Sequence, residues 1–184
     1  MSSSRRRQVR KGLDSGASII QATSITEVKE LYDILYTLYR EKVRKPLPKW
    51  PFFESFYNQL VPAGKGNIFL VYSGKKIIGG IVAPITPGKT MYELYICGLD
   101  KEYPTQHPST LATWAALEWA DQNSIPAFDF MGLGKPEIPY GVRDFKLRFG
   151  GEQVNFGRYN RKNYKILYSI AEMGYTVLRK LKWS

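Results

Sequence analysis

The chain has 184 residues, 43% of them hydrophobic, which is long and apolar enough for one domain with a buried core. Its single cysteine, Cys97, excludes an internal disulfide, and no apolar run is long enough to span a bilayer or to form a secretory signal, so we expect a cytoplasmic protein. The formal net charge of +11 favours anionic partners such as phosphate polymers or an anionic membrane surface.

Much of the positive charge lies at the two ends of the chain. Five basic residues fall within the first eleven, and the remainder of the clustered charge follows residue 157. Such ends attract polyanions through long-range, salt-sensitive fields, but they also serve simply to keep a terminus in solution. Both interpretations remain open. The second cluster consists of Arg158, Arg161, Lys162, Lys165, Arg179, Lys180 and Lys182.

The first part of the chain predicts a linker, two helices and a hairpin. Residues 1–20 are polar and basic and indicate a linker or helix fragment ahead of a domain over residues 21–184. Ser24 and Glu27 fit a capping box that begins a helix. Helical spacing of apolar residues then continues to about Val43, and a second helix covers 52–60. Strands at 67–72 and 77–85 form the hairpin, in which Gly79-Gly80 predicts a bulge or a close backbone approach.

The second part alternates strands with helices. We expect a strand at 90–97, a helix at 109–123, a strand at 127–131 and a two-turn helix that places Phe145 and Phe149 on one face. A strand at 152–159 and an amphipathic helix at 163–181 complete the chain. This pattern alone predicts an α/β or α+β fold.

The ordered segments "FDFMG", "YGVRDFKLRFGGE" and "FGRY" of residues 128–159 resemble the C-terminal part of the Fem family. Members of that family are peptidoglycan-bridge aminoacyltransferases built on the GNAT acyltransferase fold. The preceding "LATWAALEWADQNSIPAFDFMG" looks like the same family's helix-strand unit, and "SSSRRRQVRKGLDSGA" resembles its basic lead-in. The resemblance implies a single GNAT-like domain with a mixed, mostly antiparallel sheet flanked by helices.

Lys146 is the first candidate for chemistry. By the resemblance, it contacts the aminoacyl-tRNA terminus or the developing oxyanion, and Phe145 shapes the pocket. A positioned cation stabilises the oxyanion that forms when an amine attacks an ester or thioester. The ordinary alternative is a solvated lysine on a short helix whose two phenylalanines enter the core.

Other candidates surround this pair. Arginine binds phosphate through two parallel hydrogen bonds, so Arg143, Arg148 and Arg158 are expected to contact phosphate, with surface ion pairing as the alternative. Asp129 orients a cation in the cleft or accepts a hydrogen bond from a neighbouring loop. Strand alternation places Tyr95 on the same face as Met91, Glu93 and Cys97, where Tyr95 can line the cleft and Glu93 is a weak candidate base.

The remaining residues limit the chemistry. With one histidine, His107, and one cysteine, neither a Ser/His/Asp triad nor a zinc site is expected, and no cofactor is implied. Residues 99–108 hold no glycine, unlike the phosphate-binding loop of acetyl-CoA enzymes with the GNAT fold, which argues against coenzyme A.

We therefore expect transfer of an aminoacyl group from aminoacyl-tRNA to an amine of a nucleotide- or lipid-linked peptidoglycan precursor. Fem proteins usually have two GNAT-like domains, so a missing N-terminal domain is an expected partner. Peripheral contact with the inner face of an anionic membrane is expected as well. The alternatives are an acyl- or acetyl-CoA-dependent N-acyltransferase and a non-catalytic basic module that binds tRNA or membrane.

Overall fold

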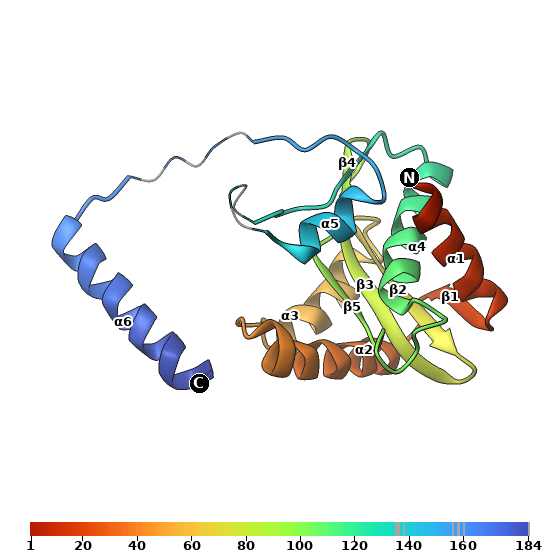
Figure 1. Cartoon of the computed structure of the whole chain (residues 1–184), viewed down its shortest axis with the longest axis horizontal. Coiled ribbons are helices and arrows are strands. Elements are labelled where there is room, and N and C mark those ends of the chain that lie inside the picture. The colour runs from red at the N-terminus through yellow and green to blue at the C-terminus, as the bar shows by residue number, and fades with distance from the viewer. Residues whose placement is uncertain (135–136, 138, 156, 158, 160, 184) are drawn as a thin grey trace. The chain divides into compact units, whose positions relative to one another are not determined.

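The computed structural model describes residues 1–134, 137, 139–155, 157, 159 and 161–183. The chain divides into two compact units, Met1–Gly151 and Glu152–Ser184. Residues 1–20, expected as a linker or helix fragment, belong to the first unit: Ser3–Asp14 forms helix α1, and Ala17–Gln21 forms strand β1, which was not expected (Figure 1). The division therefore falls at Gly151 rather than near residue 20.

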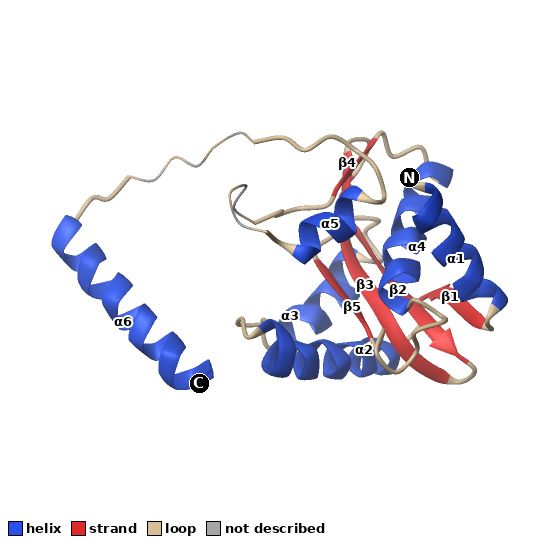
Figure 2. Ribbon diagram, in the orientation of Figure 1, coloured by secondary structure: helices blue, strands red, loops and turns tan. Residues whose placement is uncertain are grey.

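The first unit is built on a six-stranded sheet, seen in red in Figure 2. Neighbouring strands run in the order β1-β2-β3-β4-β6, and β5 also pairs with β3. All pairs are antiparallel except β4 and β6, so the expected mixed, mostly antiparallel sheet is confirmed. The further strands are β2 (Gly66–Ser73), β3 (Lys76–Thr86), β4 (Thr90–Tyr92), β5 (Tyr95–Gly98) and β6 (Ala127–Asp129).

Helices cover both faces of this sheet. Alternate residues of β2 divide between them: Phe69 and Val71 pack in one core cluster with α1 and α4, whereas Ile68 and Leu70 pack in another with α2 and α3. Burying both faces explains why β2 and β3 are almost continuously apolar. The helices are α2 (Ile25–Leu38), the π-helical turn η1 (Tyr39–Val43), α3 (Trp50–Ser55), the π-helical turn η2 (Phe56–Leu60) and α4 (Pro108–Gln122).

Two local predictions are confirmed. The capping box forms at the start of α2, where Ser24 and Glu27 exchange side-chain-to-backbone hydrogen bonds. In β3, a Cβ atom on Gly80 would lie 2.5 Å from the carbonyl oxygen of Phe69, and one on Gly79 would lie 2.7 Å from that of Cys97. Only glycine permits this approach of the backbones, and the ladder shifts register just beside it.

The first unit ends with the short helix α5 (Gly141–Leu147), which carries Phe145 and Lys146. The second unit contains α6 (Lys165–Trp183), which confirms the amphipathic helix expected at 163–181. Ile166, Ile170, Met173 and Val177 recur at helical spacing along it and are exposed. The strand expected at 152–159 is wrong for the residues described there, because they are exposed and pair with no described strand.

Candidate active site

A cleft of about 630 Å³ opens in the first unit beside β5. Its lining comes from α1, η1, β5, α4 and α5, which brings together segments from the whole length of the unit. One edge of β5 pairs with β3, and no strand in the described part of the chain pairs with the other. The cleft wall therefore includes Ile96, Cys97 and Gly98 on a strand with an open backbone edge.

A β-bulge between β4 and β5 determines which side chains face the cleft. Met91 pairs with Ile85 and Tyr95 with Val82, so three residues, 92–94, stand opposite two, 83 and 84. The extra residue reverses the alternation of side chains beyond it. The expected common face of Met91, Glu93, Tyr95 and Cys97 is therefore wrong: Met91 packs in the core under α4, whereas Tyr95 and Cys97 pack with α2 and α3.

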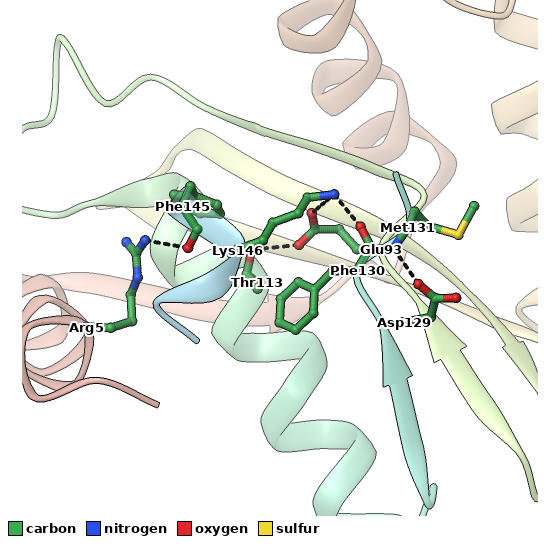
Figure 3. Close-up of polar contacts among 8 residues, drawn as sticks. All are labelled: Arg5, Glu93, Thr113, Asp129, Phe130, Met131, Phe145 and Lys146. Carbon is green, nitrogen blue, oxygen red and sulfur yellow. Dashed lines mark hydrogen bonds and ion pairs between the residues drawn. The ribbon is translucent and has the colours of Figure 1, made fainter. Parts of the chain in front are cut away.

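Glu93 lies within this bulge and points toward α4 and α5 (Figure 3). Its Oε2 accepts a hydrogen bond of 3.1 Å from the hydroxyl of Thr113, and its Oε1 lies 3.2 Å from the Lys146 ammonium in an ion pair. Lys146 also donates a hydrogen bond to the carbonyl oxygen of Phe130, just beyond β6. The side chains of Glu93 and Lys146 are only 1% and 9% exposed, so Lys146 belongs to a buried ion pair at the cleft, and the alternative of a solvated lysine does not hold.

Burial raises the pKa of Glu93 above its ordinary value of 4.5, and the charge and hydrogen bond of Lys146 and the hydroxyl of Thr113 oppose this shift. Two neighbouring groups also have raised pKa values. Burial raises the pKa of Cys97 and of Tyr39, each to about 12, so both side chains are protonated near neutral pH. Of these three groups, Glu93 is therefore the candidate for proton exchange during a reaction.

The loop between β5 and α4 brings an acidic side chain to the start of α4. The carboxylate of Asp100 accepts a 3.2 Å hydrogen bond from the backbone N–H of Ser109 and a second from the Ser109 hydroxyl. His107 precedes α4 in a left-handed conformation, with φ of 49°, and Pro108 follows at the first helical position. Burial lowers the pKa of His107, so it is mostly neutral at pH 7. A helix N-terminus attracts anions, and the N-terminus of α4 already binds the carboxylate of Asp100.

The structure places some of the predicted site residues in the cleft and others outside it. Lys146, Phe145 and Arg148 line the cleft, but Arg143, Tyr95 and Asp129 do not. The Arg143 side chain donates a 3.2 Å hydrogen bond to the carbonyl oxygen of Leu133, and Tyr95 packs against Tyr39, Phe52 and Phe53. Asp129 is exposed and accepts a 2.6 Å hydrogen bond from the backbone of Met131, its expected loop alternative. Arg158 lies outside the described residues.

Sequence reasoning missed the residues that hold this cluster together. Arg5, which the sequence showed only as part of the basic N-terminal cluster, is 3% exposed and lines the cleft. Burial, followed by the charge of Arg148, lowers its pKa to about 10, and the charge of Asp100 opposes this shift. Thr110 and Thr113 also went unnoticed, although their spacing of three on a helix was a usable signal that both face one partner surface.

The described residues contain neither a metal-binding cluster nor a membrane-spanning helix. No group of three or more histidine, cysteine, aspartate or glutamate side chains gathers there in a way that could hold a metal ion. None of the helices in that part of the chain combines the length and the apolar content needed to cross a membrane.

The mostly antiparallel sheet, the bulge between β4 and β5, the parallel strand β6 and the cleft beside β5 define a GNAT-like acyltransferase fold. The chain belongs to the GNAT acetyltransferase domain family, whose model matches residues 3–147. No curated protein sequence matches the chain significantly.

Solved structures share this fold at low sequence identity. An aminoglycoside acetyltransferase, meta-AAC0020, from an uncultured soil metagenomic sample, in complex with sisomicin, is 14% identical with a TM-score of 0.58, covering 82% of this chain and 99% of that one. AAC(6')-Iy in complex with the bisubstrate analogue CoA-S-monomethyl-acetylneamine is 13% identical, with a TM-score of 0.57 and coverage of 80% and 99%. A ribosomal-protein-alanine N-acetyltransferase from Brucella melitensis biovar Abortus 2308 is 9% identical, with a TM-score of 0.58 and coverage of 80% and 99%.

Proposed function

We propose that this chain is an N-acyltransferase that moves an acyl group from a coenzyme A thioester to an amine. The observation that carries the proposal is the buried Glu93–Lys146 ion pair, which lines the cleft beside the open edge of β5. A base and a cation in the same cleft are what aminolysis of a thioester needs.

The open edge of β5 suits the pantetheine arm of coenzyme A. That arm contains two amides, which can pair with the free backbone groups of residues 95–98 as an added strand would. Membership of the GNAT acetyltransferase family supports the same donor. An aminoacyl ester offers fewer groups for such pairing.

The reaction follows from the two charged groups. The amine nitrogen forms a bond to the thioester carbon, its extra proton passes to the Glu93 carboxylate, and the C–S bond then breaks as the proton is returned to the leaving sulfur. The raised pKa of Glu93 brings it closer to the working pH, which favours transfer in both directions. An ammonium carries three N–H donors. Two of those on Lys146 face Phe130 and Glu93, leaving one for the developing oxyanion.

Aminoacyl transfer of the Fem type remains a second candidate because of Asp100. Its carboxylate occupies the N-terminus of α4, where it would repel the diphosphate of coenzyme A. A donor without a diphosphate at this position, such as aminoacyl-tRNA, avoids that repulsion. In this candidate Phe145 and Lys146 meet the tRNA terminus, Arg148 contacts phosphate, and the acceptor is a peptidoglycan-precursor amine supplied with the help of a further domain.

A donor competition tests both candidates. The protein is incubated with labelled acetyl-CoA or labelled aminoacyl-tRNA and a panel of primary amines, and labelled amide is measured for the wild type, Glu93→Gln and Glu118→Gln. Glu118 is an exposed residue of α4 and supplies the matched control. We expect turnover with acetyl-CoA that Glu93→Gln lowers by roughly a hundredfold and Glu118→Gln leaves unchanged. Turnover with aminoacyl-tRNA alone would establish the second candidate, and none with either donor would contradict both.

A further inference from the structure

Arg5 links the N-terminal helix to the end of α5. Its Nη2 donates a 2.9 Å hydrogen bond to the carbonyl oxygen of Phe145 (Figure 3). Its Nη1 donates a 2.7 Å hydrogen bond to the hydroxyl of Thr110. The guanidinium also lies over two aromatic rings, 4.3 Å from the centre of Phe145 and 4.5 Å from that of Phe149. One buried side chain therefore joins α1, α4 and α5.

The carbonyl that Arg5 binds lacks its usual helical partner. At the end of α5 the backbone N–H of Phe149 bonds to Lys146, three residues back, at 2.9 Å instead of reaching Phe145. Carbonyls at a helix C-terminus need such outside partners. The start of α1 supplies a second one, because the backbone N–H of Ser2 donates a 2.9 Å bond to the carbonyl of Arg148. Two donors, one from the N-cap and one from the first turn of α1, thus hold the C-terminal end of α5.

An arginine is a costly choice for this position if packing is its only role. Its side chain is almost fully buried, its Nε has no hydrogen-bond partner in the described part of the chain, and none of its direct partners is acidic. Burying such a charge is unfavourable, and an apolar side chain of similar length would fill the space at lower cost. What an apolar side chain lacks is the forked pair of directed hydrogen bonds.

We propose that Arg5 is a positioning residue: by fixing the carbonyl of Phe145 and the rings of Phe145 and Phe149, it sets the place at which Lys146 meets Glu93. Thr110 anchors the fork, and Thr113, on the same helix, anchors the Glu93 carboxylate. Helix α4 thereby binds both the Arg5 guanidinium and the Glu93 carboxylate. Helix α1 contributes Arg5 and so helps to position the charged groups of the cleft.

The first test needs no substrate. The titration of Glu93 is followed by NMR of its side-chain carboxyl carbon in the wild type and in Arg5→Lys, Arg5→Met and Arg10→Met. Lys146 lowers the Glu93 pKa, so a displaced Lys146 moves the titration of Glu93 upward, and the shift is largest when the contact is lost completely. Lys146→Met defines that limit. We expect Arg5→Met to approach the limit and Arg5→Lys, which keeps the charge but not the fork, to move in the same direction. Arg10→Met, an exposed change on the same helix, should titrate as the wild type does.

Backbone amide exchange over residues 141–149 gives an independent measurement, and exchange there should quicken in both Arg5 variants. If Arg5→Met fails to fold, Arg5→Lys alone decides. A lowered melting temperature with an unmoved Glu93 titration and unchanged exchange in α5 would overturn the proposal and leave Arg5 as a packing residue.

The last measurement rests on the proposed function. With acetyl-CoA and an accepted amine, Arg5→Lys should lower kcat by between about tenfold and a hundredfold, the scale of a misplaced catalytic group, while KM changes little. Absence of turnover in the wild type would count against the proposed function only, because the titration and exchange measurements still decide the role of Arg5. An unchanged kcat in an active enzyme would contradict that role.

Discussion

Thr110 and Thr113 lie one turn apart on α4, and each binds the charged group of a buried residue. Thr110 accepts from the Arg5 guanidinium at 2.7 Å, and Thr113 donates to the Glu93 carboxylate at 3.1 Å. These two threonines are 3% and 0% exposed within a helix whose other buried residues are mostly alanine, leucine and proline. A narrow polar stripe in an apolar helix thus orients a cation and an anion toward α5.

Removing Lys146 should destabilise the fold. Lys146→Met leaves the Glu93 carboxylate buried without its cation, and breaking such a pair costs about 3–5 kcal/mol. Chemical denaturation at neutral pH measures the loss. The double variant Glu93→Gln/Lys146→Met should recover much of it, because no uncompensated charge remains. A loss of less than about 0.5 kcal/mol, typical of surface lysines, would show that the pair is solvated.

Stability and activity should depend on pH in opposite directions. Because the pKa of Glu93 is raised above 4.5, the folded protein holds this proton at pH values where the unfolded chain has lost it. The free energy of unfolding should therefore decrease as pH rises from about 4.5 through the folded pKa. Activity should increase over the same pH range, because Glu93 loses its proton there and can then act as a base. Denaturation of the wild type and Glu93→Gln across this range measures the first effect, and parallel curves for the two proteins would contradict the assignment.

Phe149→Ala should cost about 3–5 kcal/mol, because the Phe149 ring is 6% exposed and packs against Phe145 and Phe130. Phe52→Ala supplies the control, since Phe52 is 42% exposed and its removal leaves no comparable cavity. Thermal or chemical unfolding compares the two variants. Equal losses would indicate that burial of Phe149 does not anchor α5.

Replacing Asp100 should separate the two donors. Asp100→Asn keeps a hydrogen-bond acceptor at the N-terminus of α4 but removes the negative charge. If the diphosphate of coenzyme A approaches this helix, its affinity should rise by up to about tenfold, measured by calorimetry at low salt. The affinity of uncharged pantetheine should not change and serves as the control. An unaltered affinity for coenzyme A would place its diphosphate elsewhere.

Local sequence patterns predicted much of the architecture. The Ser24–Glu27 capping box, the hairpin around Ser73 and the long helix after Pro108 depend on neighbouring residues, so short-range rules reach them. Strand β1 was not predicted, because its residues Ala17–Gln21 show little alternation of apolar and polar side chains. They are stabilised by pairing with β2, about fifty positions further along the chain.

The candidate site was predicted only in part, for a physical reason. Phe145 and Lys146 could be singled out, but the state of Lys146 depends on Glu93, which lies 53 positions earlier in the chain. Arg5 contacts Phe145 across 140 positions, and no local pattern distinguishes it from the solvated arginines beside it. The bulge that directs Glu93 toward α4 could not be predicted from the sequence either, because it depends on how two strands pair. Three residues, 92–94, stand opposite two, 83 and 84, which is a one-residue difference in length.

That one-residue difference has a consequence for how the chain tolerates changes in length. Deleting one residue from 92–94 would restore regular pairing with β3 and turn every later side chain of the strand over. Cys97 would then leave the core formed with α2 and α3, and the open strand edge would meet the cleft with the opposite set of backbone groups. Insertions in the exposed turn at 74–75 carry no such penalty. Homologous sequences should therefore vary in length at that turn and keep a constant count between Ile85 and Gly98.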